Sequence, residues 1–266
     1  MRDLEKQVSK YFARFSAEPP AEQNAIDLLS GAWTTDFPGV STGGGFNGCN
    51  DGRIQWLKTL CELKGKKVLE LGPLEGAHTF MLEQAGAEVT AIEANHGAFL
   101  RCLIAKNLLN MKARFLLGDF EKFDFGSERF DLLVASGVLY HLKDPGEFLK
   151  WVSQAADRLF VWTHYFEPDT DRWHPNLQKA IRKGKWETKN VITTHVDGVT
   201  VRLVRQRYGD SLGWSGFCGG TDTFSHWMFR EDLLSLVERL GYRDIQVNFD
   251  QVDHQNGPAF AFFAEK

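Results

Sequence analysis

The chain has 266 residues, of which 43% are apolar and 25% are charged. This composition is typical of a globular protein that buries a core without disulfides or metal. The formal net charge of −4 excludes a general electrostatic attraction to nucleic acid or to an anionic membrane. No apolar run approaches the roughly 20 residues of a membrane helix, and the four scattered cysteines form no zinc or disulfide pattern. We therefore expect a cytoplasmic protein with no membrane partner and no metal site.

Residues 1–65 are predicted to form a helical N-terminal extension with a glycine-rich lid. Apolar residues recur at three- and four-residue steps from Arg2 to Phe15 and from Arg53 to Leu63, which predicts two amphipathic helices. A shorter helix is expected over residues 21–30. The loop from Thr35 to Gly52 contains STGGGFNGCNDG. Such a glycine content indicates either a movable lid or a backbone that approaches another group closely, and both interpretations stay open.

From residue 66 onward, short apolar runs alternate with helical patterns. The predicted strands are KKVLEL, AEVTAIEA, ARFLLGD, FDLLVAS and RLFVWTH. Strands that are apolar throughout and separated by helices are typical of a parallel sheet covered on both faces. The pattern predicts a doubly wound α/β domain over residues 66–266.

The alternation breaks at about residues 167–228, which we interpret as an insertion after the fifth strand. A short helix over residues 176–183 and a β-hairpin with its turn at Asp197-Gly198 are predicted within it. Order resumes with a helix from Arg230 to Leu240. Two closing strands, RDIQVNF and GPAFAFFAE, follow without an intervening helix, so they are expected to pair antiparallel.

The first predicted strand runs into VLELGPLEG, which spans Val68 to Gly76. Glycine lets the chain turn tightly and lets backbone N–H groups approach a ligand. The next strand ends in Glu93, an acid placed to accept hydrogen bonds from two ribose hydroxyls. Leu74 stands where a dinucleotide motif needs its second glycine, and Glu75 adds negative charge where phosphates would lie. A nucleoside ligand without phosphates is therefore favoured over a nicotinamide cofactor.

Four motifs in this order resemble the class I S-adenosylmethionine-dependent methyltransferases, which have a Rossmann-like fold. E-x-G-x-x-x-G follows strand one, an acid ends strand two, Gly118-Asp119-Phe120 follows strand three and SGVLYHLKDP follows strand four. The resemblance covers about residues 66–165. It implies a mainly parallel seven-stranded sheet with an antiparallel last strand. The SGVLYH stretch is similar, within this class, to tRNA wobble-uridine carboxymethyl-forming enzymes.

The resemblance implies S-adenosyl-L-methionine as the cofactor. Gly72 and its neighbours would pack against the methionine part, Glu70 would reach the ammonium group through water, and Glu93 would hold the ribose hydroxyls. Asp119 would accept from the adenine amine, while the backbone N–H of Phe120 donates to the ring. The implied cofactor residues are Glu70, Gly72, Pro73, Gly76, Glu93, Ala94, Asp119, Phe120, Ser136 and Gly137.

Methyl transfer from a sulfonium needs alignment of the reactants and, for some acceptors, a base that removes a proton. The ends of strands four and five face the cofactor in this class, which makes His141, His164 and Tyr140 the catalytic candidates. Each also has a structural interpretation, as a loop hydrogen-bond partner or a half-buried core residue. Both interpretations stay open.

The insertion is the candidate acceptor-binding element. Its rings suit a sugar, a flat ring or an unstacked base; they belong to Trp173, Trp186, Tyr208, Trp214 and Phe217. A basic run from Lys179 to Lys189 is either a phosphate contact or a solvated helix face. The predicted function is methyl transfer to oxygen or nitrogen of a small-molecule or saccharide-like acceptor. A tRNA-modifying enzyme, which the net charge does not favour, and a non-catalytic S-adenosylmethionine-binding protein are the alternatives.

Overall fold

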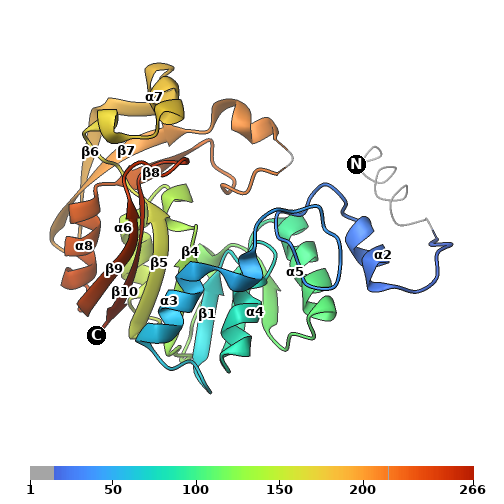
Figure 1. Cartoon of the computed structure of the whole chain (residues 1–266). Helices are drawn as coiled ribbons and strands as arrows, with labels where there is room; N and C mark the ends of the chain where they lie inside the picture. Colours follow the sequence, from blue (N-terminus) through green and yellow to red (C-terminus); the bar gives the residue numbers. More distant parts are fainter. Residues whose placement is uncertain (1–14, 215) are drawn as a thin grey trace.

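A seven-stranded sheet forms the centre of the molecule, with strand order β3-β2-β1-β4-β5-β10-β9 (Figure 1). The computed structural model describes residues 15–214 and 216–266. Apart from Phe15, the helix predicted between Arg2 and Phe15 lies outside these described residues.

The parallel part of the sheet has five strands: β1 (Lys67–Leu71), β2 (Glu88–Glu93), β3 (Arg114–Leu117), β4 (Leu132–Ser136) and β5 (Arg158–His164). Two closing strands, β9 (Arg243–Gln251) and β10 (Ala259–Glu265), complete it. β10 runs antiparallel to both of its neighbours, β5 and β9. The prediction of a mainly parallel seven-stranded sheet with an antiparallel last strand is confirmed.

Helices cover both faces of the sheet. One face carries α3 (Gly52–Leu60), α4 (Ala77–Gln84) and α5 (His96–Leu108), and the other carries α6 (Pro145–Val152) and α8 (Arg230–Arg239) (Figure 1). Because successive strand side chains point to opposite faces, Val68 of β1 packs with α3 and α4, while Leu69 packs with α6 and α8. This alternation is what a sheet buried on both sides requires.

The insertion contains α7 (Pro175–Arg182) and a second sheet of three strands, one more than the predicted hairpin. β6 (Trp186–Val196) and β7 (Val199–Arg207) pair across Asp197-Gly198, both of which have positive φ, as the predicted turn needs. β8 (Phe224–Met228) adds to β7. This strand was not predicted, because five residues directly after a glycine-rich stretch give too short a strand pattern in the sequence.

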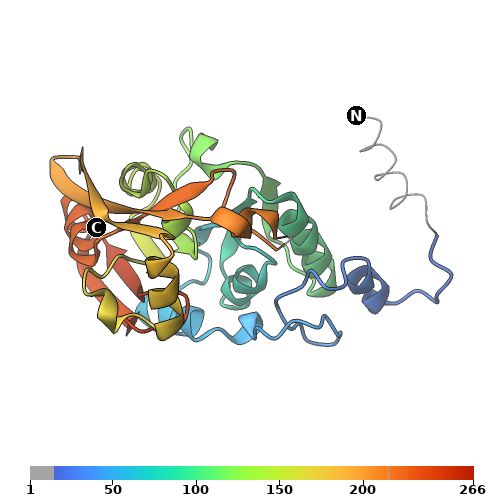
Figure 2. The ribbon, with the colours of Figure 1, turned by 90° about the horizontal axis from the view of Figure 1, so that it is seen from above.

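The second sheet is part of the same core rather than a separate lobe. Val196, Val201 and Leu203 are buried in one cluster with residues of α6 and α8. In Figure 1 the insertion lies above the ends of β4 and β5. Figure 2 shows α7 at the end of the molecule away from α2 (Glu22–Asp27), while residues 209–214 and 216–221 reach back towards the start of α5. The insertion is therefore held firmly over one end of the sheet.

Five short 3-10 helices connect these elements: η1 (Gly48–Asn50), η2 (Phe120–Lys122), η3 (Leu139–His141), η4 (Thr170–Arg172) and η5 (Gly209–Gly213). The helix predicted over residues 21–30 is shorter and corresponds to α2. None of the helices in the described ranges is long and apolar enough to cross a membrane.

Candidate active site

A cleft of about 620 Å³ lies at the carboxyl ends of β2, β1, β4 and β5. These four neighbouring strands span roughly 14 Å at the usual strand spacing. Hydrogen bonds beyond the strand ends hold the floor of the cleft: Gly72 N donates to Ile92 O at 2.9 Å, and Gly137 N donates to Trp162 O at 2.9 Å. The volume falls within the range of small-molecule sites, roughly 300–1,000 Å³.

Most of the predicted site residues line this cleft. They are Gly72, Pro73, Glu93, Ala94, Phe120, Ser136 and Gly137 from the cofactor set, and Tyr140 and His141 from the catalytic set. Four predicted site residues do not line the cleft: Glu70, Gly76, Asp119 and His164. The roles of all these residues stay predictions.

The turn between β1 and α4 holds three residues in the left-handed backbone region, Gly72, Leu74 and Gly76. Gly72 has φ 64°, and a Cβ there would lie 2.9 Å from Cγ2 of Val138, so only glycine fits without movement. Leu74 has φ 57°, a conformation that favours glycine. Its backbone N–H donates to Oε2 of Glu93 at 3.0 Å, which offsets the strain and fixes the turn.

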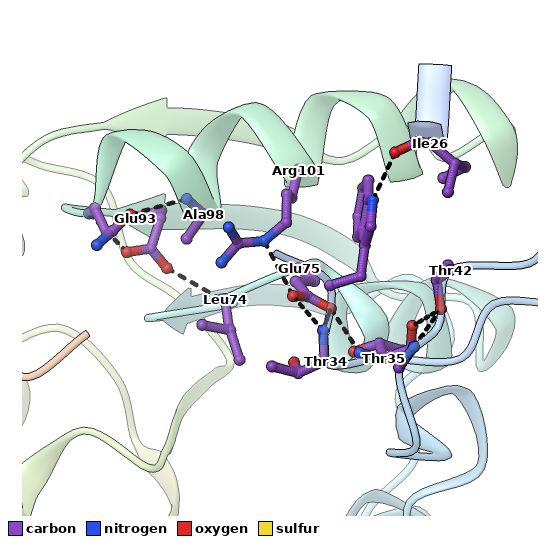
Figure 3. Close-up of polar contacts among 12 residues, drawn as sticks. Ile26, Thr34, Thr35, Thr42, Leu74, Glu75, Glu93, Ala98 and Arg101 are labelled. Carbon is purple, nitrogen blue, oxygen red and sulfur yellow. Dashed lines mark hydrogen bonds and ion pairs between the residues drawn. The ribbon is translucent and has the colours of Figure 1, made fainter. Parts of the chain in front are cut away.

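Glu93 closes β2 with its carboxylate at the cleft wall. It is 7% exposed and accepts from the N–H groups of Leu74, at 3.0 Å, and Asn95, at 2.8 Å (Figure 3). Burial raises the pKa of Glu93, and the backbone donors oppose that shift. A carboxylate has about four acceptor positions, so two remain for the hydroxyls of a bound ribose.

Glu75 belongs to the cleft lining, and its carboxylate contacts the N-terminal segment at Thr34 and Thr35 (Figure 3). The side chain is 1% exposed and accepts from the N–H groups of Thr34, at 2.9 Å, and Thr35, at 2.8 Å. Nε of Arg101 lies 3.0 Å from its Oε1. Glu75 belongs to the cleft lining as expected, but its carboxylate is paired with Arg101 and with the N–H groups of Thr34 and Thr35.

The glycine-rich segment packs closely on the turn that Glu75 anchors. Oγ1 of Thr42 donates to Thr35 O at 2.6 Å, and Phe46 N donates to Thr34 O at 2.9 Å. A Cβ on Gly44 would lie 2.5 Å from the backbone of Thr34. Of the two interpretations of this segment, the described contacts favour close backbone approach; Thr35 and Phe46 line the cleft.

Glu70 lies on the α4 side of β1, beneath the cleft. It is 2% exposed, and the hydroxyl of Thr79 on α4 donates to its Oε2 at 2.5 Å. Burial raises the pKa of Glu70 to about 7, although the Thr79 hydrogen bond acts in the opposite direction. Near neutral pH this buried carboxyl is therefore close to half protonated.

The raised pKa of Glu70 predicts a specific pH dependence of stability. The folded chain keeps a proton that the unfolded chain releases above its ordinary pKa of about 4.5. This contribution to stability is complete below pH 4.5 and is lost as the pH rises through about 7. Between pH 5 and pH 8, the free energy of unfolding of the wild type should fall by up to roughly 3 kcal/mol relative to Glu70→Gln.

Urea unfolding of both proteins at several pH values measures this difference. The matched control is Glu88→Gln, at the exposed start of β2, whose pH profile should follow that of the wild type. Parallel profiles for wild type and Glu70→Gln would mean that Glu70 is ionised like a surface carboxyl.

Asp119 caps η2 rather than entering the cleft. It accepts from Glu121 N at 3.1 Å and forms an ion pair with Lys122 at 2.9 Å. The neighbouring Phe120 does line the cleft. The contact between Asp119 and an adenine amine stays a prediction.

Aromatic side chains and a histidine form the end of the cleft at β4 and β5. Tyr140 and His141 come from η3, and Trp162 comes from β5. The guanidinium of Arg53 lies 4.5 Å from the ring centre of Trp162 and is held by Asp51 at 3.0 Å. The sequence did not single out these two residues as site residues. Arg53 looked like an ordinary residue at the start of a helix, and Trp162 like an ordinary residue of an apolar strand.

His141 sits at the boundary between the cleft and the insertion. Its Nδ1 lies 3.0 Å from the hydroxyl of Tyr208, the residue that follows β7. Burial lowers the pKa of His141 to about 4, so the ring is neutral at neutral pH.

His164 lies behind Tyr140 and away from the cleft. It is 5% exposed, its Nδ1 donates to Gly257 O at 2.9 Å, and its ring stacks on Trp227 with centroids 5.1 Å apart. The ring of Tyr140 lies across it, with centroids 4.5 Å apart. These contacts give His164 a structural position, so His141 is the histidine that we carry forward as a candidate base.

The aromatic residues of the insertion that were predicted to bind an acceptor lie in different places, and Trp214 is 64% exposed and outside the cleft lining. Trp173 and Trp186 are buried against Phe166 and Trp227, so they build the core and do not face the cleft. Phe217 lines the cleft as part of the segment 217–221, which forms its roof on the insertion side. No residue of the basic run Lys179 to Lys189 belongs to the described lining.

The chain matches a known family over residues 69–156, and that family is described as a methyltransferase domain. A tRNA U34 carboxymethyltransferase of Idiomarina loihiensis is 26% identical over 201 residues, which cover 73% of this chain and 50% of the relative. A second one, of Campylobacter hominis, is 29% identical over 45% of this chain and 43% of the relative. The chain thus spans about half the length of the curated relatives that it matches.

Solved structures share the fold at low identity. The N-terminal domain of EvdMO1, solved in the presence of SAH and D-fucose, has a TM-score of 0.63 at 20% identity and covers 91% of this chain and 93% of its own. A S-adenosylmethionine-dependent methyltransferase from Mesorhizobium loti has a TM-score of 0.55 at 17% identity, with 81% of this chain and 99% of that chain covered. The fold of the whole described chain is therefore one that such proteins use.

Proposed function

We propose that this chain, which carries a class I S-adenosylmethionine-dependent methyltransferase domain, transfers a methyl group to oxygen or nitrogen of a small acceptor. The family match agrees with the four sequence motifs and with S-adenosylmethionine as the cofactor. The observation that carries the proposal is one cleft lined both by the buried carboxylate of Glu93 and by His141 among aromatic rings.

The residues of the cleft fit the cofactor. Glu93 offers two free acceptor positions, and the absence of a Cβ at Gly72 leaves the backbone open to close approach. Oγ of Ser136 is buried and has no hydrogen-bond partner among the described residues. A ligand group in the cleft would satisfy this hydroxyl. These features support the sequence-based placement of the cofactor over β2, β1 and β4.

We assign His141 the role of base and Tyr140 that of a wall for the methyl pocket. Bound S-adenosylmethionine supplies a methyl group on a positively charged sulfur that leaves as a neutral thioether. The imidazole of His141 is neutral and can accept a proton during the transfer, although the burial that lowers its pKa to about 4 makes it a weak base. The rings of Tyr140 and Trp162 restrict the position of the acceptor.

The size and shape of the cleft favour a small-molecule or saccharide-like acceptor. Trp162, Arg53 and the segment 217–221 also line the cleft, and we assign Trp162 and Arg53 to the acceptor. Aromatic faces and a charged hydrogen-bond donor are groups that suit a sugar ring. The structural neighbour EvdMO1 was solved together with a sugar, D-fucose.

A tRNA acceptor is the second candidate, favoured by the relatives that are tRNA U34 carboxymethyltransferases. A flipped base would also fit between aromatic rings. Against it stand the net charge of −4 and the position of the basic run on α7 and β6, outside the cleft lining.

Two measurements test the proposal. Calorimetry with S-adenosylhomocysteine should show binding, and no binding would contradict the cofactor assignment. Radiolabelled S-adenosylmethionine is then offered with a panel of monosaccharides that includes D-fucose, with phenols and amines, and with bulk tRNA. Label in a small acceptor supports the proposal, whereas label in tRNA alone, with affinity that falls steeply with salt, supports the second candidate.

A further inference from the structure

We infer that Tyr208 is a positioning residue, which fixes the tautomer of His141 so that Nε2 presents a lone pair to the cleft. The inference rests on the proposed function and narrows its substrate class. Tyr208 belongs to the insertion, 67 positions from His141 in the sequence, and no motif pointed to it.

The ring of His141 is neutral, so it carries one proton on one of two nitrogens. Burial lowers the pKa of His141 to about 4, well below neutral pH. In a neutral imidazole, the partner of one nitrogen decides which nitrogen carries the proton. The only described hydrogen-bond partner of this ring is the hydroxyl of Tyr208, 3.0 Å from Nδ1.

The hydroxyl of Tyr208 has one proton, and its polar neighbours are Nδ1 and the backbone oxygen of His141 and the side chain of Ser225. Burial raises the pKa of Tyr208 to about 12, so the hydroxyl is protonated at neutral pH. It lies 3.4 Å from the backbone carbonyl oxygen of His141, which accepts and never donates. When the hydroxyl donates to this carbonyl, its oxygen is left to accept from Nδ1–H. The ring proton is then on Nδ1, and Nε2 is unprotonated.

The free nitrogen belongs to a residue that lines the cleft. His141 contributes to the lining, and Nε2 has no hydrogen-bond partner in the described part of the chain. With Nδ1 committed to the insertion side, Nε2 is the nitrogen available to an acceptor. The Tyr208 ring itself is held by Phe217 of the cleft roof, with ring centroids 4.9 Å apart.

This arrangement selects acceptors that must lose a proton. The acceptor oxygen or nitrogen forms a bond to the methyl carbon as the carbon–sulfur bond breaks, and that electron pair stays on sulfur. The acceptor proton moves to Nε2, and the imidazolium that results keeps Nδ1–H donating to Tyr208 until water removes the proton. A hydroxyl or a primary or secondary amine fits this step, whereas a carboxylate has no proton to give.

Nuclear magnetic resonance of the full chain labelled with nitrogen-15 histidine tests the tautomer. His141→Gln identifies the signals of His141 by removing them. The wild type should show a protonated Nδ1 and an unprotonated Nε2, and Tyr208→Phe should lose that pattern. A protonated Nε2 in the wild type would overturn the inference. Because this readout needs no turnover, it succeeds or fails independently of the proposed function.

Kinetics test the consequence with the acceptor identified above. Tyr208→Phe keeps the ring against Phe217, so its affinity for S-adenosylhomocysteine should stay within about twofold while kcat falls by about tenfold or more. The matched control is Tyr165→Phe, which removes a hydroxyl that lies 3.3 Å from Asp250 and outside the cleft lining. Its kcat should be unchanged. An unchanged kcat in Tyr208→Phe would overturn the positioning role.

Discussion

Glu75→Ala should lower the free energy of unfolding by about 3–5 kcal/mol, the usual cost of removing one partner of a buried ion pair. The change leaves the guanidinium of Arg101, 13% exposed, without its carboxylate. It also leaves the N–H groups of Thr34 and Thr35 without their acceptor. Unsatisfied buried donors add to the loss. Urea denaturation monitored by tryptophan fluorescence measures it.

The reference for this variant is Glu62→Ala, which removes an exposed carboxylate next to α3 and should change stability by less than about 0.5 kcal/mol. A cycle with Glu75→Leu, Arg101→Met and the double variant isolates the ion pair. The double variant should be less destabilised than the sum of the single ones, because no charge is left unpaired. Equal stability of Glu75→Ala and Glu62→Ala would contradict the anchoring role.

Glu93→Ala should weaken the binding of S-adenosylhomocysteine at least tenfold. Two hydrogen bonds from ribose hydroxyls to a charged group are lost, and each is worth more than a neutral one. Leu74 N also loses the acceptor that holds it at φ 57°. The loop that carries Gly72 then relaxes, which adds to the loss. Isothermal titration calorimetry gives the affinity.

Glu88→Ala is the matched control, since it removes a carboxylate from the other, exposed end of β2. Its affinity should equal that of the wild type. If Glu93→Ala binds as tightly as this control, the ribose does not lie at Glu93. A thermal unfolding curve of each variant separates lost binding from lost folding.

The fold followed from the sequence because its signals are local. Apolar strands such as β1 and β4, separated by helical spacing, predict a buried parallel sheet whatever their partners are. Glu93 was identified in the same way, because an acid that ends β2 lies at the carboxyl edge of the sheet, where the cleft is. Seven of the ten predicted cofactor residues line the cleft on this basis.

What escaped prediction depends on contacts between distant segments. The partners of Glu75 escaped prediction, because nothing near it in the sequence reveals Arg101 or the N–H groups of Thr34 and Thr35. His164 ends β5 and His141 lies shortly after β4, so the sequence treats them alike. Only packing shows that His164 lies behind Tyr140 and that His141 lies beside Tyr208. Trp173 and Trp186 carry rings that suit a ligand but are needed to fill the core of the insertion.

The inner position of β10 has a consequence for synthesis on the ribosome. β5 ends at His164 and its partner β10 begins at Ala259, so 94 residues separate two strands that lie side by side. At about 5–20 residues per second, translation leaves one edge of β5 unpaired for roughly 5–20 seconds. That edge belongs to an apolar strand, the kind that recruits other chains. Most of the delay is the insertion, so the element that adds residues 217–221 to the cleft also prolongs the interval in which the nascent chain is prone to aggregate.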